Sequence, residues 1–312
     1  MTIQTVSAAP SRSQLWMAAV KPPMYSVAVM PIWVGSLMAY AHTGQFRGDV
    51  FVTFVLSALL LLVWENLAND VFDAETGIDK NKAHSVVNLT QRPRLIFWLG
   101  NLALALGIAG IVTLAYRQRD PMVLGLILLC CLIGYLYQGP PFRLGYQGWG
   151  EPLCFVAFSV GVAAAYYSQA QRLPGAVWVA AALAGLPVTL VLFCSHFHQV
   201  EDDLAAGKRS PIVRLGTEGG ARLLWWLCGA MFAIALLGIL GQALPVTGLL
   251  VFASFPLAWQ LCRHVSQTHD QPDQVKNAKF VAIRFQFVSG LLLGLSFWVT
   301  RFDVPLGGLL GG

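Results

Sequence analysis

The sequence predicts an all-α fold, an integral membrane bundle of about nine transmembrane helices. Of the 312 residues, 56% are hydrophobic and only 11% are charged, whereas soluble domains carry roughly 25% charged residues. Apolar runs of about 20 residues, the length that spans a bilayer, recur along the chain. A soluble protein this apolar has too few polar residues to cover its surface, so the composition indicates lipid as the solvent.

Nine apolar segments are candidate spans, and several begin with proline, whose missing N–H costs nothing in the first helical turn. In chain order they are Pro23–Ala41, Val50–Ala68, Leu95–Tyr116, Pro121–Tyr137, Pro152–Ala170, Pro174–Cys194, Leu223–Gln242, Pro245–Leu261 and Phe285–Thr300. Pro31, Pro187 and Pro256 lie inside spans and are expected to kink them. Residues 1–312 are predicted to form one membrane-embedded domain, with a polar and flexible segment of about 20 residues at its start.

The Lys and Arg residues are distributed unevenly between the two sides of the predicted bundle. One side has most of them: Arg12, Lys21, Lys80, Lys82, Arg92, Arg94, Arg143, Lys208, Arg209, Arg214, Arg222, Arg263, Lys276, Lys279 and Arg284. The other side has Arg47, Arg117, Arg119, Arg172 and Arg301. Because basic loops stay in the cytoplasm, we expect a cytoplasmic N-terminus and a C-terminus on the opposite side.

The six cysteines fall in or near apolar segments and form no C-x-x-C motif. Without a partner at metal-binding spacing, they are interpreted as small buried hydrophobic residues rather than as a metal or redox site.

Two clusters of acidic and amide side chains follow the second and the sixth span, both on the predicted cytoplasmic side. The first cluster contains Asn66, Asn69, Asp70, Asp73 and Asp79, and the second contains Gln199, Asp202 and Asp203. In a continued helix, Asn66, Asp70 and Asp73 share one face at spacings of four and three residues. Polar stripes at the ends of apolar helices are costly unless something pairs with them.

Oxygen-rich ligand sets of this kind suit Mg²⁺, which takes one or two carboxylates and completes its shell with water and substrate phosphates. The clusters therefore predict a Mg²⁺ and diphosphate site in which Asp70, Asp73 and Asp203 are the catalytic carboxylates. Basic candidates for binding the diphosphate are Lys21, Arg143, Lys208 and Arg209. His196 and His198 are candidates for the acceptor side, with a hydrogen-bonded structural role as the alternative. The simpler interpretation of both clusters is ordinary solvated helix ends.

An ion-coupled transporter is an alternative of another class, since such proteins also carry acids in helical bundles. Transporters place ionisable residues near the bilayer midplane and are built from inverted repeats. Here both clusters lie at one membrane face, and no inverted repeat is evident, so the pattern favours an enzyme.

The first cluster resembles the aspartate-rich motif N-D-x-x-D-x-x-x-D of the UbiA-type membrane prenyltransferases, and the resemblance covers essentially the whole chain. Asn69, Asp70 and Asp73 match that motif, Gly77 occupies its last aspartate position, and Asp79 follows two residues later. The G-x-D variant is similar to that of the branch acting on 1,4-dihydroxy-2-naphthoate.

The second cluster resembles the motif D-x-x-x-D followed by A-x-G-K-R. Asp203 and the run from Ala206 to Arg209 match, and the first aspartate position falls on Gln199. The run from His196 to Asp203, and that from Gly139 to Glu151, are similar to those of phytyl-transferring members in photosynthetic organisms.

The resemblance implies a nine-helix, Mg²⁺-dependent enzyme that uses phytyl diphosphate and 1,4-dihydroxy-2-naphthoate as substrates. The expected reaction is transfer of the phytyl group with loss of CO₂ and diphosphate, giving demethylphylloquinone. It also implies the plasma or thylakoid membrane of a photosynthetic bacterium as its location. Prenylation of another aromatic acceptor, such as homogentisate or a chlorophyll precursor, is the alternative within the family, and no nucleic-acid partner is expected.

Overall fold

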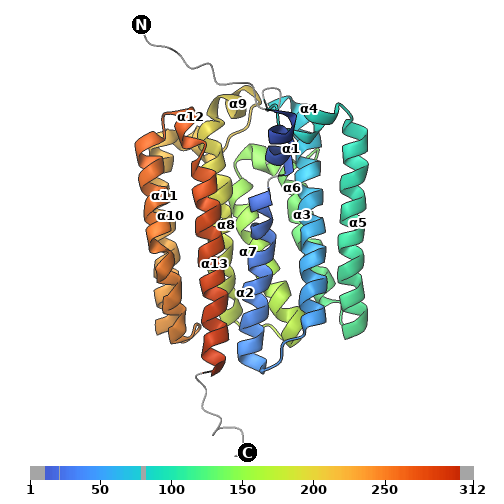
Figure 1. The fold of residues 1–312 in the computed structure, drawn as a ribbon, viewed down its shortest axis with the longest axis vertical. Coiled ribbons are helices and arrows are strands. Elements are labelled where there is room, and N and C mark those ends of the chain that lie inside the picture. The colour runs from blue at the N-terminus through green and yellow to red at the C-terminus, as the bar shows by residue number, and fades with distance from the viewer. Residues whose placement is uncertain (1–10, 21, 79–81, 303–312) are drawn as a thin grey trace, which may run out of the picture.

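The computed structural model describes residues 11–20, 22–78 and 82–302, and within these ranges the chain forms helices and no strands. The long helices run side by side as one bundle, and α1, α4, α9 and α12 all lie at the same end of it (Figure 1). The helices that cross the bundle are α2 (Ser26–Thr43), α3 (Gly48–Thr76), α5 (Pro93–Gln118), α6 (Met122–Gln138), α7 (Gly150–Ala170), α8 (Ala176–Ser195), α10 (Pro211–Leu240), the consecutive η5 (Val246–Ser254) and α11 (Phe255–Thr268), and α13 (Ala278–Phe302). The short elements are α1 (Arg12–Val20), η1 (Pro22–Tyr25), α4 (Val86–Thr90), η3 (Leu144–Gln147), η4 (His196–His198), α9 (Val200–Ala205) and α12 (Pro272–Val275).

Each of the nine predicted spans corresponds to one crossing of the bundle, so the predicted all-α membrane fold is confirmed. Eight helical segments among the described residues are long and apolar enough to span a bilayer, and α6, with 17 residues, is a shorter apolar helix. The eighth crossing begins as a 3₁₀ helix and becomes α-helical near Pro256. Proline has no N–H to donate, and its ring crowds the turn that precedes it. The turn before Pro256 is accordingly 3₁₀, and the α-helix begins at Phe255. By contrast, α2 and α8 continue through Pro31 and Pro187.

Part of the polar segment before the first span, which the sequence predicts to be flexible, is helical: Arg12–Val20 forms α1. This short helix contacts α4, and Ala18 lines the main cavity of the bundle. The structure therefore places α1 at the end of the bundle where the acid clusters lie.

Helix α8 forms the centre of the bundle, where it packs against α7, α10 and α13. In its most apolar stretch 78% of the residues are buried, whereas in that of α3 only 22% are buried. Large apolar side chains point outward from the peripheral helices, including Trp226 on α10 and Trp98 on α5. Such a surface is stable only where lipid replaces water.

Small residues let the central helices approach closely, as is common in membrane bundles. A Cβ atom on Gly35 of α2 would clash with the backbone oxygen of Val162 on α7. A larger residue at Gly35 would force these two helices apart, and both helices line the cavity described below.

Helix α3 is long enough to carry polar residues beyond the apolar part of the bilayer. It has 29 residues, whereas about 20 suffice to span. Its last turns therefore project from the apolar layer and carry Asn69 and Asp73 at the end where α9 follows α8. This extension, rather than a loop, positions the first acid cluster.

Candidate active site

A cavity of about 740 Å³ runs into the bundle from the end that carries the two acid clusters. Side chains of α2, α3, α6, α7, α8 and α13 line it. On α3 its lining extends from Asp73 to Phe54, about 28 Å at 1.5 Å per residue. Polar and charged residues line the end near the clusters, and the deeper part is mainly apolar. The cavity can therefore hold an anionic head group and a long hydrocarbon tail together.

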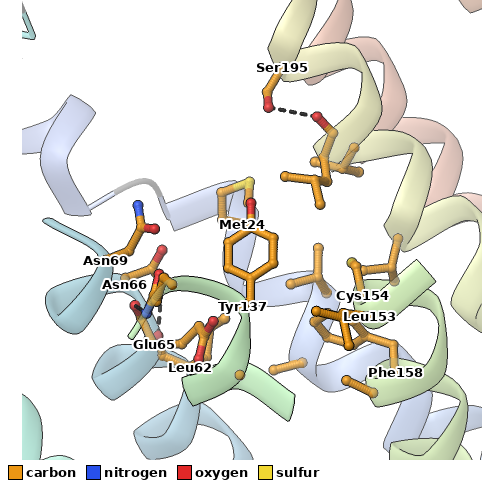
Figure 2. Close-up of a pocket in the computed structure, with 18 of the residues that line it drawn as sticks. Met24, Leu62, Glu65, Asn66, Asn69, Tyr137, Leu153, Cys154, Phe158 and Ser195 are labelled. Carbon is orange, nitrogen blue, oxygen red and sulfur yellow. Dashed lines mark hydrogen bonds between the residues drawn. The ribbon is translucent and has the colours of Figure 1, made fainter. Parts of the chain in front are cut away.

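The first cluster is built around Asp73, which two neighbours orient. Asn69 donates a hydrogen bond from Nδ2 to Asp73 Oδ2 at 2.9 Å, and Tyr146 donates from its hydroxyl to Asp73 Oδ1 at 2.8 Å. Asn66, Asn69 and Asp73 all line the cavity. Figure 2 shows Asn66 and Asn69 on one wall, with Tyr137 between them and the opposite wall of Leu153 and Phe158. The predicted grouping of Asn66, Asn69 and Asp73 is thus present.

Asp70 occupies a different environment from the one the sequence suggests. It is 5% exposed and accepts hydrogen bonds from the backbone N–H of Val86 at 2.7 Å and from Lys82 Nζ at 3.2 Å. It does not line the cavity. At 100° per residue, Asn69 lies about 40° from Asp73 around the helix, and Asp70 lies about 60° away on the other side. The carboxylate of Asp70 therefore fixes the start of α4.

The second cluster centres on Asp203, which is fully buried and lines the cavity. His196 Nδ1 lies 3.1 Å from Asp203 Oδ2, and its Nε2 lies 3.4 Å from Glu151 Oε1. Lys208 Nζ lies 3.5 Å from Asp203 Oδ1. Burial alone would raise the pKa of Asp203, but the hydrogen bond from His196 and the charge of Lys208 hold that pKa below its usual range. Asp203 is therefore an anion at neutral pH.

The other residues predicted for the second cluster also line the cavity. They are His196, His198, Gln199, Asp202 and Lys208. His196 lies between two carboxylates and orients Asp203. The Nδ1 atom of His198 is buried and has no hydrogen-bond partner among the described residues. Of the two predicted histidines, His198 is thus the one with a ring nitrogen left for a ligand.

The predicted cations divide into those at the cavity and those outside it. Lys208 lines the cavity, whereas Arg143 forms an ion pair with Glu75 at 3.0 Å and does not line it. Arg209 is also outside the lining; its backbone N–H donates to Tyr146 O at 2.7 Å. Two of the predicted residues, Lys21 and Asp79, lie outside the described part of the chain.

Tyr146 of η3 joins the two clusters. Its hydroxyl binds Asp73, its backbone oxygen accepts from Arg209, and the ammonium group of Lys208 lies 5.7 Å from the centre of its ring. The loop between α6 and α7 thus contacts both sides of the cavity mouth. Burial and the neighbouring Asp73 raise the pKa of Tyr146, so it remains a hydrogen-bond donor at neutral pH.

Several cavity residues are absent from the sequence prediction. Lys82 and Lys279 add positive charge at the mouth, where His84 also lies, and Glu65 and Tyr137 lie further in. Glu65 could have been predicted from the sequence, because an acid within an apolar span indicates a functional site. No sequence pattern predicts Lys279, because it lies in the first turn of α13, far along the chain from both clusters.

The donor set fits Mg²⁺ that shares its ligands with a phosphate. Among the described residues, no three His, Cys, Asp or Glu side chains converge on one metal position. Each cluster instead presents carboxylate and amide oxygens, and Asp203 Oδ1 is buried without a hydrogen-bond partner. Mg²⁺ typically takes one or two carboxylates and completes its shell from water and substrate phosphates.

Comparison with known proteins gives consistent matches along nearly the whole chain. The model of the UbiA prenyltransferase family matches residues 28–290. A Synechocystis protein named 2-carboxy-1,4-naphthoquinone phytyltransferase is 51% identical over 93% of this chain and 95% of its own. The chloroplastic protein of the same name from Arabidopsis thaliana is 40% identical over 93% of this chain and 78% of its own. A solved UbiA homolog from Archaeoglobus fulgidus, bound to GPP and Mg²⁺, shares the fold with a TM-score of 0.60 at 16% identity, covering 92% of this chain and 99% of that one.

Proposed function

The chain belongs to the UbiA prenyltransferase family, and on that basis we propose that it transfers a phytyl group from phytyl diphosphate to 1,4-dihydroxy-2-naphthoate, with loss of CO₂ and diphosphate. The observation that carries the choice of substrates is the 51% identity, over nearly the full length of both chains, to a relative named as a phytyltransferase of a carboxylated naphthoquinone. The cavity supports it, because acid clusters and lysines surround its mouth and apolar residues line its depth.

The residues at the mouth bind and orient the diphosphate. We propose that Asp73, Asp202 and Asp203, with the amide oxygens of Asn69 and Gln199, hold Mg²⁺ against it. When bound, Mg²⁺ supplies positive charge that stabilises the departing diphosphate. Asn66 lines the same wall and is a further predicted oxygen ligand, whereas the contacts of Asp70 favour an indirect role.

The deeper residues control what happens to the prenyl group. As the C–O bond ionises, the apolar lining keeps water away from the allylic cation and limits its hydrolysis. The cavity holds the tail in line with the mouth, so that the electron-rich ring attacks from a fixed direction. The new bond forms at the ring carbon bearing the carboxylate, and CO₂ leaves. Because donor tail and product are both lipids, a bundle open to the membrane suits this reaction.

The test of the proposed substrates is product mass after incubating the purified protein in lipid with competing acceptors and donors. We expect prenylated naphthoquinone from phytyl diphosphate and 1,4-dihydroxy-2-naphthoate. Geranylgeranyl diphosphate should react about 10- to 200-fold less well, because apolar pockets discriminate tail shape by only about 1–3 kcal/mol. Prenylated homogentisate or an esterified chlorophyll precursor, without any naphthoquinone product, would overturn the acceptor and leave prenyl transfer intact.

Lys208 and Arg143 should differ in their effect on the donor. Lys208→Ala is expected to raise the KM for prenyl diphosphate by about 10-fold or more, because a charge-assisted phosphate contact is lost. Arg143→Ala should change it less, because Arg143 is paired with Glu75 outside the cavity. Lys276→Ala is the matched control, since Lys276 is 54% exposed and pairs with Asp273. Steady-state kinetics with each substrate varied in turn measure the difference; equal donor KM values in the Lys208 variant and the parent would contradict it.

We also propose that the end of the bundle carrying the clusters faces the cytoplasm, in the plasma or thylakoid membrane of a photosynthetic bacterium. The excess of Lys and Arg in the loops at that end supports this orientation. A reporter fused after Gln91, in the loop before α5, should read cytoplasmic, and one fused at Arg301, at the end of α13, should read non-cytoplasmic. The reverse pair of readings would refute the orientation without affecting the fold.

A further inference from the structure

Glu65 is an acid on the cavity wall, inside the apolar part of α3. It lines the cavity one helical turn inward from Asn69 and two turns inward from Asp73, which is about 6 Å and 12 Å along the helix axis. Figure 2 shows Glu65 on the same wall as Asn66 and Asn69, beside Tyr137. The side chain therefore lies between the level of the diphosphate and the apolar depth that would take the tail.

The carboxyl group of Glu65 has no hydrogen-bond or ion-pair partner among the described residues. The basic side chains that line the same cavity, Lys82, Lys208 and Lys279, come from the ends of the helices and the loops at the mouth. An acid in such surroundings is costly unless a polar group pairs with it. Nothing in the folding of the bundle explains why an acid is kept there.

The neighbouring helix leaves room for this carboxyl group. A Cβ atom on Gly134 of α6 would lie 2.6 Å from Glu65 Oε2, closer than any side chain tolerates. One turn further along α6, Gln138 Nε2 donates to the backbone oxygen of Glu65 at 3.1 Å, which fixes the two helices at this level. The backbone of Glu65 is thus held at this level, and the neighbouring helix leaves space for its carboxyl group.

We propose that Glu65 determines acceptor specificity by accepting a hydrogen bond from a ring hydroxyl of the aromatic acceptor. This inference rests on the proposed function, because it takes a hydroxylated aromatic acid as the acceptor. A hydroxyl is the neutral donor that such a ring presents, and its bond to Glu65 satisfies the acid when the site is filled. The lysines at the mouth attract the acceptor's own carboxylate. The ring is therefore oriented with one hydroxyl towards Glu65 and its carboxylate towards the mouth.

The test compares Glu65→Leu and Glu65→Gln with the parent protein in lipid. Glu65→Leu should raise the KM for 1,4-dihydroxy-2-naphthoate by about 10- to 100-fold, because the ring hydroxyl is left buried without an acceptor. The KM for the prenyl diphosphate should stay unchanged. Glu65→Gln keeps an accepting oxygen and should lie between Glu65→Leu and the parent. Glu218→Gln is the matched control, because Glu218 is 72% exposed and contacts Arg222.

Analogues of the acceptor that lack one ring hydroxyl identify the group that Glu65 binds. The analogue without that hydroxyl should bind the parent and Glu65→Leu equally, and the other analogue should keep the difference. Equal acceptor KM values in parent and Glu65→Leu, or a loss confined to kcat, would overturn the inference. If the parent prenylates a different hydroxylated aromatic acid, the proposed acceptor is wrong, and the same comparison on that acid still decides the role of Glu65.

Gly134→Ala gives an independent test that keeps the acid. The added methyl group should displace the Glu65 carboxyl group and raise the acceptor KM in the same direction as Glu65→Leu. In a Glu65→Ala background, Gly134→Ala should add little, because the group it displaces is gone. Additive effects of the two substitutions would contradict the proposal. Thermal unfolding of each variant in lipid separates these results from a general loss of fold.

Discussion

Replacing Asp73 or Asp203 by Asn is expected to lower kcat/KM at least about 100-fold, which corresponds to about 2.7 kcal/mol of transition-state stabilisation. Each substitution keeps the shape of the side chain but removes a negative charge that faces the cavity mouth, where the cation and diphosphate are proposed to bind. Asp203 is fully buried, between His196 and Lys208, so its charge is a fixed part of the site. Steady-state assays on purified variants in lipid measure the loss.

Two further variants separate this effect from a general loss of structure. Asp49→Asn removes an exposed acid at the opposite end of α3 that lies 3.7 Å from Arg117 in an exposed ion pair, and it should leave kcat/KM unchanged. Asp70→Asn should mainly lower the free energy of unfolding, by about 1–3 kcal/mol. The backbone N–H of Val86 and the ammonium group of Lys82 both lose a charged partner. Near-normal activity of both the Asp73 and the Asp203 variants would refute the proposed roles of the clusters. A catalytic loss in Asp70→Asn as large as theirs, with stability unchanged, would restore Asp70 as a ligand.

Removing divalent cations with excess chelator is expected to lower turnover by about 1,000-fold or more, because several kcal/mol of charge stabilisation on the leaving group are lost. Added Mg²⁺ should restore the rate. Ca²⁺ should restore less, since it prefers longer bonds and more ligands than a Mg²⁺ site provides. Full activity after exhaustive chelation, checked by metal analysis of the sample, would exclude a divalent cation from the reaction.

The architecture was predictable because its signals are local. Each span is a mainly apolar run, and all nine occur as helical crossings of the bundle. The pairing of Asn69 with Asp73 also follows from helical spacing alone, since residues four apart share a face. Both clusters follow an even-numbered span, the second and the sixth, so both are expected at the same end of the bundle.

The remainder of the site depends on tertiary packing that spacing cannot reveal. Asp70 has the same residue type and almost the same position as Asp73, yet the start of α4 takes its carboxylate. Lys279 reaches the cavity because α13 packs against α2 and α8. Arg143, predicted to bind phosphate, forms an ion pair with Glu75 outside the cavity lining. In each case the three-dimensional neighbour, rather than the sequence context, decides what the side chain does.

The two contacts of Tyr146 have a consequence for how the enzyme can diversify. Tyr146 of η3 hydrogen-bonds to Asp73 on one side of the mouth and to the backbone of Arg209 on the other. These two bonds fix the distance between the two acid clusters. The width of the head-group site is thus set independently of the depth of the cavity. Every prenyl diphosphate has the same head group, so tail length and saturation can be retuned through apolar residues such as Phe54 and Phe158 alone. Different residues therefore recognise the diphosphate and the tail, and a change of tail need not alter the residues that bind the diphosphate.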